Sequence, residues 1–176
     1  MLGVGQVCPP KNHYKEIIKF LKEKNVVCIA DEVQAGFGRI GSHFWTFEYY
    51  DVLPDIVTLG KPMGNGLPVA AVVTTKEIAQ AFKERGLEFF SSFGGNPVSM
   101  AAINAVLDVM EEEKLQENAK LVGDYLLENL NLIKKECPYI GDVRGHGFFI
   151  GIDFVTDRES KTRNQDLAKK ISIKLR

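Results

Sequence analysis

The sequence has almost no excess charge, few cysteines and no long apolar run. Its 22 basic and 23 acidic residues leave a formal net charge of -1, which gives no reason to expect a nucleic acid or an anionic membrane as a partner. No apolar stretch approaches the roughly 18 residues needed to span a bilayer. The three cysteines, Cys8, Cys28 and Cys137, contain no CxxC pair. We therefore expect reduced thiols in an intracellular protein, and neither a disulfide framework nor a zinc site.

The beginning of the chain and its length set two further limits. Residues 1–6 have neither a basic region followed by an apolar core nor an Arg/Ser-rich amphipathic stretch, so we expect no targeting segment in this chain. The 176 residues are enough for one ordinary domain or for pieces of two.

Apolar runs that alternate with helix-like segments predict an α/β fold. Runs rich in β-branched residues predict strands at 26–30, 55–60 and 69–74, and a short strand is predicted at 88–91. Continuous runs of this kind are typical of a parallel sheet that is covered on both faces.

Helix signals punctuate the same stretch and continue beyond it. Apolar spacing and capping residues, among them Thr75 and Asn96-Pro97, predict helices at 13–24, 76–85, 96–113, 115–135 and from about 164. After Pro138 the pattern changes to short strands, at 141–144 and 148–154. We place a domain boundary near 113–116, with an α+β segment after it.

Two of the strand-like runs end in residues that suit an aldehyde cofactor. Asp31-Glu32 follows the first run and Lys61 follows the second. The carboxyl ends of parallel strands meet at one rim of a sheet, where open α/β sheets bind their ligands. A lysine there can form a Schiff base with pyridoxal phosphate, and a carboxylate can pair with its pyridine nitrogen.

Each of these residues also has a plainer interpretation. Acids are common where a strand meets a loop, and the pair Asp31-Glu32 could instead serve acid–base catalysis or bind a metal. The metal interpretation is weak because the three histidines show no ligand spacing. Lys61 could be an ordinary exposed loop lysine, but it directly follows an apolar run, and the Pro and Gly residues after it indicate a fixed, irregular loop.

Four motifs surround these two residues in a fixed order. They are IADEVQAGFGR at 29–39, PDIVTLGK at 54–61, GNGLP at 64–68 and FGGNP at 93–97. In these stretches the sequence resembles the class III pyridoxal-phosphate-dependent aminotransferases of fold type I. Residues 144–151 are similar to the first strand of that family's C-terminal domain.

The resemblance implies a domain plan and a homodimer. Residues 1–114 would form part of the large cofactor-binding domain, with a mainly parallel sheet, and residues 115–176 would begin a smaller α+β domain. The family builds each active site from two subunits, so a homodimer is implied, and a tetramer is also open. We interpret the aromatic run at 44–50 as packing or dimer interface in preference to a substrate-binding surface.

The resemblance also implies a role for each matching polar residue. Asp31 would pair with the pyridine nitrogen, and Gln34 would lie near the phenolic oxygen of the ring. Lys61 would hold the cofactor covalently and then act as the acid–base catalyst at the α-carbon of the substrate. Ser92 stands where the family commonly has a Thr that reaches the cofactor phosphate in the partner subunit.

A narrower resemblance concerns the reaction. The stretches GQVCPP at 5–10, GSHFW at 41–45 and KPMGNG at 61–66 are similar to the alanine–glyoxylate-aminotransferase-2-like proteins. That group includes phospho-lyases acting on phosphoethanolamine and 5-phosphohydroxylysine. We favour a lyase, and keep transamination of the alanine–glyoxylate type as the alternative. The resemblance implies a mitochondrial location, and a cytoplasmic one is also open.

Several parts of the family pattern have no counterpart in this chain. Family chains are more than twice as long, and their Gly/Ser phosphate-binding loop, ring-stacking aromatic residue and carboxylate-binding arginine are not found here. A hypothesis of another class follows: the chain alone is a catalytically incomplete fragment, with a partial sheet and exposed apolar edges.

Overall fold

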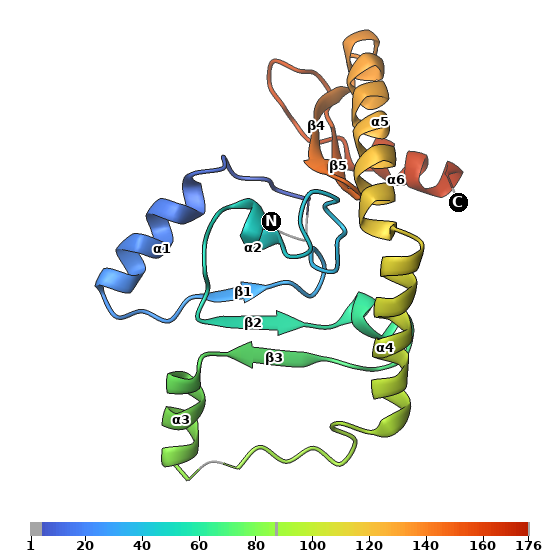
Figure 1. Ribbon diagram of the computed structural model, residues 1–176. Helices are drawn as coiled ribbons and strands as arrows, with labels where there is room; N and C mark the ends of the chain where they lie inside the picture. The colour runs from blue at the N-terminus through green and yellow to red at the C-terminus, as the bar shows by residue number, and fades with distance from the viewer. Residues whose placement is uncertain (1–4, 87, 176) are drawn as a thin grey trace.

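The computed structural model describes residues 5–86 and 88–175, which form two sheets joined by two long helices (Figure 1). The first sheet consists of β1 (Ile29–Asp31), β2 (Ile56–Leu59) and β3 (Ala71–Thr74). The second consists of β4 (Ile140–His146) and β5 (Phe149–Phe154). The helices are α1 (His13–Glu23), α2 (Thr46–Tyr49), the 3-10 turn η1 (Lys61–Gly64), α3 (Lys76–Glu84), α4 (Pro97–Glu112), α5 (Leu115–Glu136) and α6 (Gln165–Lys174). Among the described residues, no helix is both long and apolar enough to cross a membrane.

The helices begin where the sequence provides hydrogen-bonding caps. The hydroxyl of Thr75 accepts the N–H of Ile78 at 3.4 Å, at the start of α3. At the start of α4, the side-chain oxygen of Asn96 accepts the N–H of Ser99 at 2.9 Å. Such caps satisfy N–H groups that have no partner within the helix. Both predicted caps are confirmed, and all five predicted helices are present.

The first sheet is mixed. β1 runs parallel to β2, with Asp31 opposite Thr58, whereas β3 runs antiparallel to β2, with Leu59 opposite Ala71. A parallel return needs a crossover of about a dozen or more residues, usually a helix. The connection 60–70 contains only the short turn η1, so the chain turns back beside β2. The strand predicted at 69–74 is therefore present, but its predicted parallel direction is wrong.

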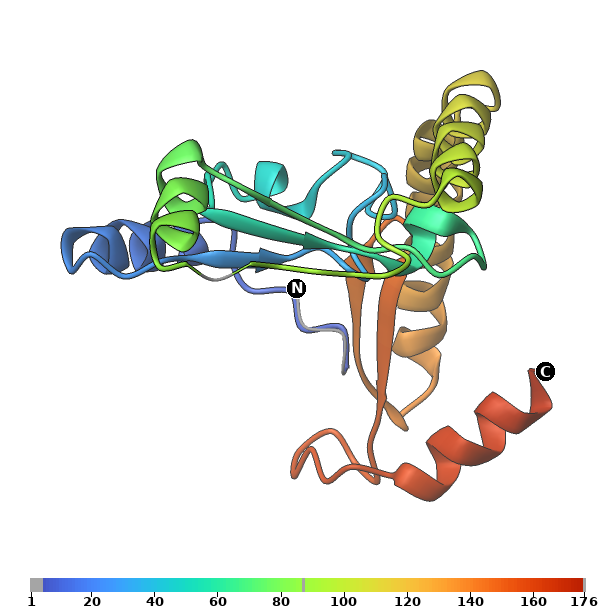
Figure 2. The same ribbon diagram turned by 90° about the horizontal axis from the view of Figure 1, so that it is seen from below.

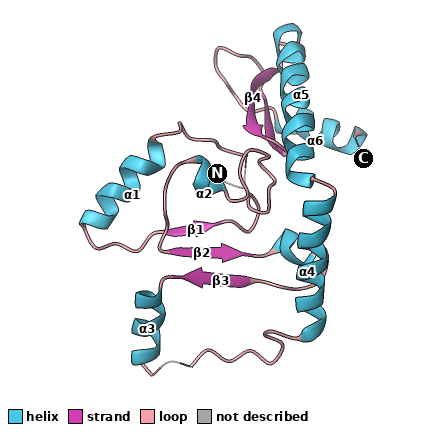
Figure 3. Ribbon diagram, viewed as in Figure 1, coloured by secondary structure: helices cyan, strands magenta, loops and turns pink. Residues whose placement is uncertain are grey.

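The strand predicted at 88–91 is also wrong. Residues 88–96 form an irregular connection between α3 and α4, drawn as loop in Figure 3. A β-strand needs the hydrogen bonds of a neighbouring strand, and β3 is paired only with β2 in the part of the chain described. The apolar residues that suggested a strand are instead exposed, with 85% of Phe89 and 86% of Phe90 accessible.

The prediction that the sheet is covered on both faces does not hold for this chain. Val72 and Val73 of β3 are 68% and 54% exposed. Successive residues of a strand point to opposite faces, so both faces of β3 are open. Ile29 of β1 is 61% exposed as well. The described residues therefore leave a large part of an apolar sheet uncovered.

The second sheet packs against α5 and is joined to the loop that follows β1. β4 and β5 form an antiparallel hairpin that runs alongside α5 (Figure 2). The N–H of Phe148 donates to the carbonyl of Arg39 at 2.9 Å, and Phe149 belongs to a buried core with Ala35 and Ile40. Lys114, the residue directly before α5, has a left-handed φ of 51°. This position falls within the domain boundary predicted near 113–116, which stays a prediction.

Candidate active site

Asp31 and Lys61 lie at the same edge of the first sheet. Asp31 is the last residue of β1, and Lys61 is the first residue of η1, which follows β2. Because β1 and β2 are parallel neighbours, their carboxyl ends meet at one edge (Figure 1). Both residues that the sequence singled out therefore follow the carboxyl ends of one strand pair, the kind of edge where open α/β sheets bind ligands, and their roles stay a prediction.

The carboxylate of Asp31 is anchored through one of its two oxygens. Its Oδ1 accepts the N–H of Val33 at 3.1 Å and the hydroxyl of Thr58 at 3.3 Å. No donor among the described residues reaches its Oδ2. Asp31 is exposed. The side chain is thus oriented by the protein and still open to a ligand.

Glu32, the next residue, faces the interior. It is 3% exposed, and its Oε1 accepts the N–H of Phe47 at 2.9 Å. This hydrogen bond ties the start of α2 to the end of β1. Within residues 5–86 and 88–175, no group of three or more His, Cys, Asp and Glu is arranged to hold a metal ion. Of the two adjacent carboxylates, Glu32 is therefore buried, and Asp31 is the exposed one that a ligand can reach.

Lys61 has an unusual backbone conformation. Its φ is 35°, a left-handed value that is uncommon outside glycine and that costs of the order of 1 kcal/mol. The N–H of Met63 donates to the carbonyl of Gly60 at 3.0 Å, closing the turn around it. Lys61 is exposed. Backbone strain of this kind is common at functional sites, and no local pattern in the sequence indicated it.

Gln34 lies in the tight connection that follows Asp31. It is exposed, and the turn around it depends on Gly36, where an added Cβ would lie 2.9 Å from the carbonyl oxygen of Glu32 and 2.9 Å from the Trp45 ring. Phe37 and Phe44 both pack against Trp45. These ring contacts show that Trp45 packs within the chain, and the choice between packing and dimer interface for the run 44–50 stays a prediction.

Ser92 is not brought to this edge within the chain. It is exposed and belongs to the connection 88–96, which lies on the far side of β3 from β1 in Figure 1. Asp31, Gln34 and Lys61 therefore belong to one side of the sheet, and Ser92 to another. That separation is compatible with a residue that serves a partner subunit, and the role of Ser92 stays a prediction.

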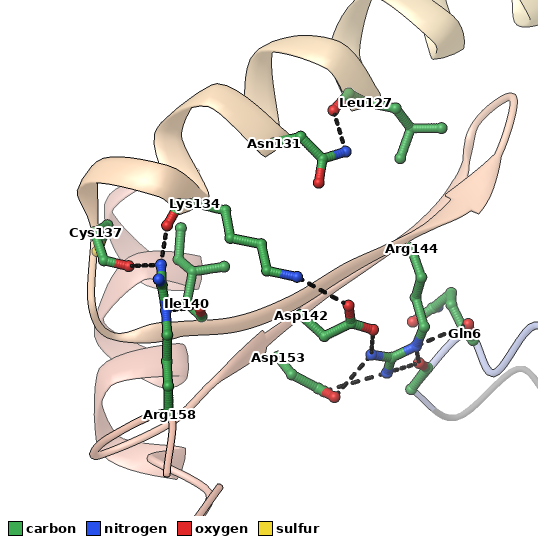
Figure 4. Close-up of polar contacts among 11 residues, drawn as sticks. Gln6, Leu127, Asn131, Lys134, Cys137, Ile140, Asp142, Arg144, Asp153 and Arg158 are labelled. Carbon is green, nitrogen blue, oxygen red and sulfur yellow. Dashed lines mark hydrogen bonds and ion pairs between the residues drawn. The ribbon is translucent and has the colours of Figure 1, made fainter.

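An ion-pair cluster around Arg144 joins the start of the chain to the second sheet (Figure 4). Its guanidinium donates to Asp142 at 3.0 Å and to Asp153 at 2.7 Å. It also donates to the backbone carbonyls of Gly5 and Gln6. The hydrogen bonds to Asp153 raise the pKa of Arg144 above its ordinary value, so the cation persists at every accessible pH. Sequence reasoning placed Arg144 in a strand and missed these contacts.

We expect Arg144→Met to lower the free energy of unfolding of the full-length protein by about 1–2 kcal/mol, because it removes charge-assisted hydrogen bonds made by a side chain that is only 20% exposed. Burial raises the pKa of Asp142, but the hydrogen bonds from Arg144 and Lys134 outweigh burial, and the pKa is lowered. The resulting stability is present above the unfolded pKa of about 3.9 and is lost as the pH falls through the lower folded value. Urea unfolding between pH 3 and 7 measures both effects. Arg85 is exposed, so the control Arg85→Met should change neither the free energy of unfolding nor its pH dependence. An equal loss of stability in both variants would contradict a stabilising role for the Arg144 ion pairs.

Known proteins resemble this chain over most of its length. The aminotransferase class-III family profile matches residues 3–174. The chain is 54% identical over 164 residues to an alanine–glyoxylate aminotransferase 2-like protein of Drosophila melanogaster. The matched region covers 93% of this chain and 33% of that protein. It is 51% identical over 156 residues to the mitochondrial alanine–glyoxylate aminotransferase 2 of Homo sapiens, covering 89% and 30%. The chain thus spans about a third of the length of these curated relatives.

Solved structures agree with this result. A phospholyase from Arthrobacter in complex with phosphoethanolamine superposes with a TM-score of 0.87 and 41% identity, covering 94% of this chain and 39% of that chain. The predicted fold class, part of a fold type I α/β transferase, is confirmed by this likeness. The motifs, the matched profile and the shared fold lead to one conclusion: the chain belongs to the class III aminotransferase family.

Proposed function

We propose that the full-length protein is a pyridoxal-phosphate-dependent enzyme whose cofactor is held by Lys61 and Asp31. The observation that carries this proposal is that Asp31 ends β1 and Lys61 follows β2, its parallel neighbour, at one edge of the sheet. An amine and a carboxylate match the aldehyde and the pyridine nitrogen of this cofactor. Both residues are exposed, so the donor set fits the group.

In this proposal each residue has a separate task. When bound, pyridoxal phosphate supplies an electron-accepting ring that stabilises negative charge at the carbon next to the substrate amine. Lys61 would hold the cofactor through its Nζ and, once the substrate amine has displaced that Nζ, would accept the proton that leaves this carbon. Asp31 accepts a hydrogen bond from the ring nitrogen and keeps that nitrogen protonated. Gln34 lies near the phenolic oxygen, and Ser92 reaches the phosphate bound in the partner subunit.

The reaction we favour is the elimination of phosphate and ammonia from phosphoethanolamine or 5-phosphohydroxylysine. The Arthrobacter structure, a phospholyase in complex with phosphoethanolamine, supports this choice. The names of the Drosophila and human relatives support the alternative, a transaminase of the alanine–glyoxylate type. Both reactions begin with removal of a proton from the carbon that carries the substrate amine, so Asp31 and Lys61 serve either one.

Product analysis of the full-length protein separates the two reactions. We expect phosphoethanolamine and water to give acetaldehyde, ammonia and inorganic phosphate in equal amounts, and 5-phosphohydroxylysine is the second substrate to test. Colorimetric phosphate and coupled ammonia assays measure this release. The comparison reaction is alanine with glyoxylate. Formation of pyruvate and glycine without any release of phosphate from either phosphorylated amine would establish the transaminase instead.

The remaining alternative is that this chain alone is a catalytically incomplete fragment. Its length, about a third of that of its relatives, and the open faces of β3 support this view. Incubation of the purified chain with pyridoxal phosphate, reduction with borohydride and peptide mapping test it. Label confined to Lys61 would show that the chain holds the cofactor by itself. The absence of label, or label spread over many lysines, would favour the fragment.

We also propose that the full-length protein is a homodimer, with a tetramer as the alternative. Phe89, Phe90 and Phe93, which flank Ser92, are 85%, 86% and 82% exposed. Three large apolar side chains in one short connection are a common feature of protein interfaces. A partner subunit at this connection would cover them and place Ser92 near a second active site. A monomer in sedimentation equilibrium of the full-length protein would contradict the proposal.

For the compartment, we propose the mitochondrion, with the cytoplasm as the alternative. The support is the similarity to a human relative that carries a mitochondrial name. Cell fractionation of the full-length protein with mitochondrial and cytosolic markers tests this proposal, and exclusive recovery with the cytosolic marker would contradict it.

A further inference from the structure

The side chain of Asp31 is held by the neighbouring strand as well as by its own. The N–H of Val33 and the hydroxyl of Thr58 both donate to Oδ1, at 3.1 and 3.3 Å. A partial rotation of the carboxylate would break both hydrogen bonds, whereas a half-turn only exchanges two equivalent oxygens and re-forms them. The two donors therefore select one orientation of Asp31, in which Oδ2 is left for another group.

Thr58 is placed for this contact by the sheet itself. Its Cα lies directly opposite that of Asp31 in the parallel pair of β1 and β2. Side chains at such paired positions share one face of the sheet. The carbonyl of Thr58 also accepts the N–H of Glu32 at 3.0 Å, which fixes β1 just beyond Asp31. A β-branched side chain has restricted χ1 rotation, so the hydroxyl has few alternative positions.

We propose that Thr58 is a positioning residue that fixes Asp31 with its Oδ2 directed toward the ring nitrogen of pyridoxal phosphate. This inference rests on the proposed function and extends it from the contacting residue to the one behind it. Thr58 does not touch the cofactor in this arrangement. Its hydroxyl donates to Oδ1, and Oδ2 accepts the N–H of the ring.

The test uses the full-length protein with Thr58→Val, which keeps the shape and removes the hydroxyl, and Thr58→Ser, which restores it. Thr74→Val is the matched control, since the hydroxyl of Thr74 donates to the backbone carbonyl of Asp55 at 3.0 Å and not to Asp31. The readouts are the dissociation constant of pyridoxal phosphate, the pH titration of the bound-cofactor absorbance and the unfolding temperature without cofactor.

We expect Thr58→Val to raise the dissociation constant about tenfold, the usual effect of losing one hydrogen bond to a charged group. In Thr58→Val, the pH midpoint of the bound-cofactor absorbance should differ from that of the unmodified protein. Its unfolding temperature without cofactor should match that of Thr74→Val. Thr58→Ser should bind the cofactor within about twofold of the unmodified protein. In an Asp31→Ala background, Thr58→Val should have no further effect, because the residue through which it acts is gone.

Two results would overturn the inference. One is a Thr58→Val variant with unchanged affinity and an unchanged titration midpoint. The other is a Thr58→Ser variant that behaves like Thr58→Val. Serine keeps the hydroxyl, so the loss of the hydroxyl could not then explain the effect of Thr58→Val. If the unmodified protein binds pyridoxal phosphate at Lys61 in these experiments, such a result defeats only the role of Thr58. If the unmodified protein does not bind it, the proposed function fails first.

Discussion

Lys61→Ala in the full-length protein is expected to reduce turnover by at least about a thousandfold. General acid–base catalysis alone contributes about 10²–10⁴ to the rate, and the variant also loses the covalent link to the cofactor. Lys61 is exposed in a short turn, so its removal leaves no cavity in the core. The initial rate of phosphate release from phosphoethanolamine measures the loss, and peptide mapping after borohydride reduction should find no label at the altered turn.

The matched control is Lys76→Ala. Lys76 is also exposed and also opens a helix, but it lies at the start of α3, beyond the antiparallel strand β3. Its removal should leave the rate of phosphate release within about twofold of the unmodified protein. A Lys61→Ala variant that keeps more than a tenth of the original rate would show that another amine holds the cofactor. Equal losses in both variants would indicate a general effect on folding.

The helices could be predicted from the sequence because their signals are local. Thr75 and Asn96 cap the helices that follow them, and each cap needs only residues within one turn. The sheet differs in this respect. The direction of β3 depends on how the connection 60–70 returns, and a run of β-branched residues is the same in either direction. The segment 88–91 has the composition of a strand but has no neighbouring strand in the described chain.

The candidate site shows the same division. Asp31 and Lys61 could be found because each directly follows a strand, and parallel strands place such residues at one edge. Thr58 could not be found in this way. Its relation to Asp31 exists only in the register between two strands that are 27 residues apart in the chain. The left-handed backbone of Lys61 was equally hidden, because a residue before proline ordinarily prefers an extended conformation.

The exposed surfaces have a physical consequence for the chain. The sheet exposes apolar side chains on both faces of β3, and a cavity of about 600 Å³ is open between η1, α4 and α5. A domain that folds alone usually buries such surfaces, because each exposed Å² of apolar area forgoes about 25 cal/mol. The relatives are about three times as long as this chain. The described residues therefore leave apolar surface that a further segment or a partner would stabilise by covering it.

Asp31→Asn is expected to lower turnover by about 10²–10⁴ in the full-length protein. The change keeps the shape of the side chain, and the amide oxygen can still accept hydrogen bonds from Val33 and Thr58. With that oxygen anchored, the amide nitrogen replaces Oδ2. A donor then faces the protonated ring nitrogen in place of a charged acceptor. Losing such a charge-assisted contact costs about 3–5 kcal/mol, which gives the expected range of rates.

Asp55→Ala provides the contrast that separates catalysis from stability. Asp55 precedes β2, at the opposite end of the strand pair, and its Oδ2 accepts the N–H of Cys28 at 2.8 Å. Its replacement should lower the unfolding temperature and leave the turnover of the folded protein nearly unchanged. Asp31→Asn should do the reverse, because its anchoring hydrogen bonds survive. If Asp31→Asn lowers the unfolding temperature as much as Asp55→Ala and keeps its turnover, then Asp31 secures the strand end and some other group meets the ring nitrogen.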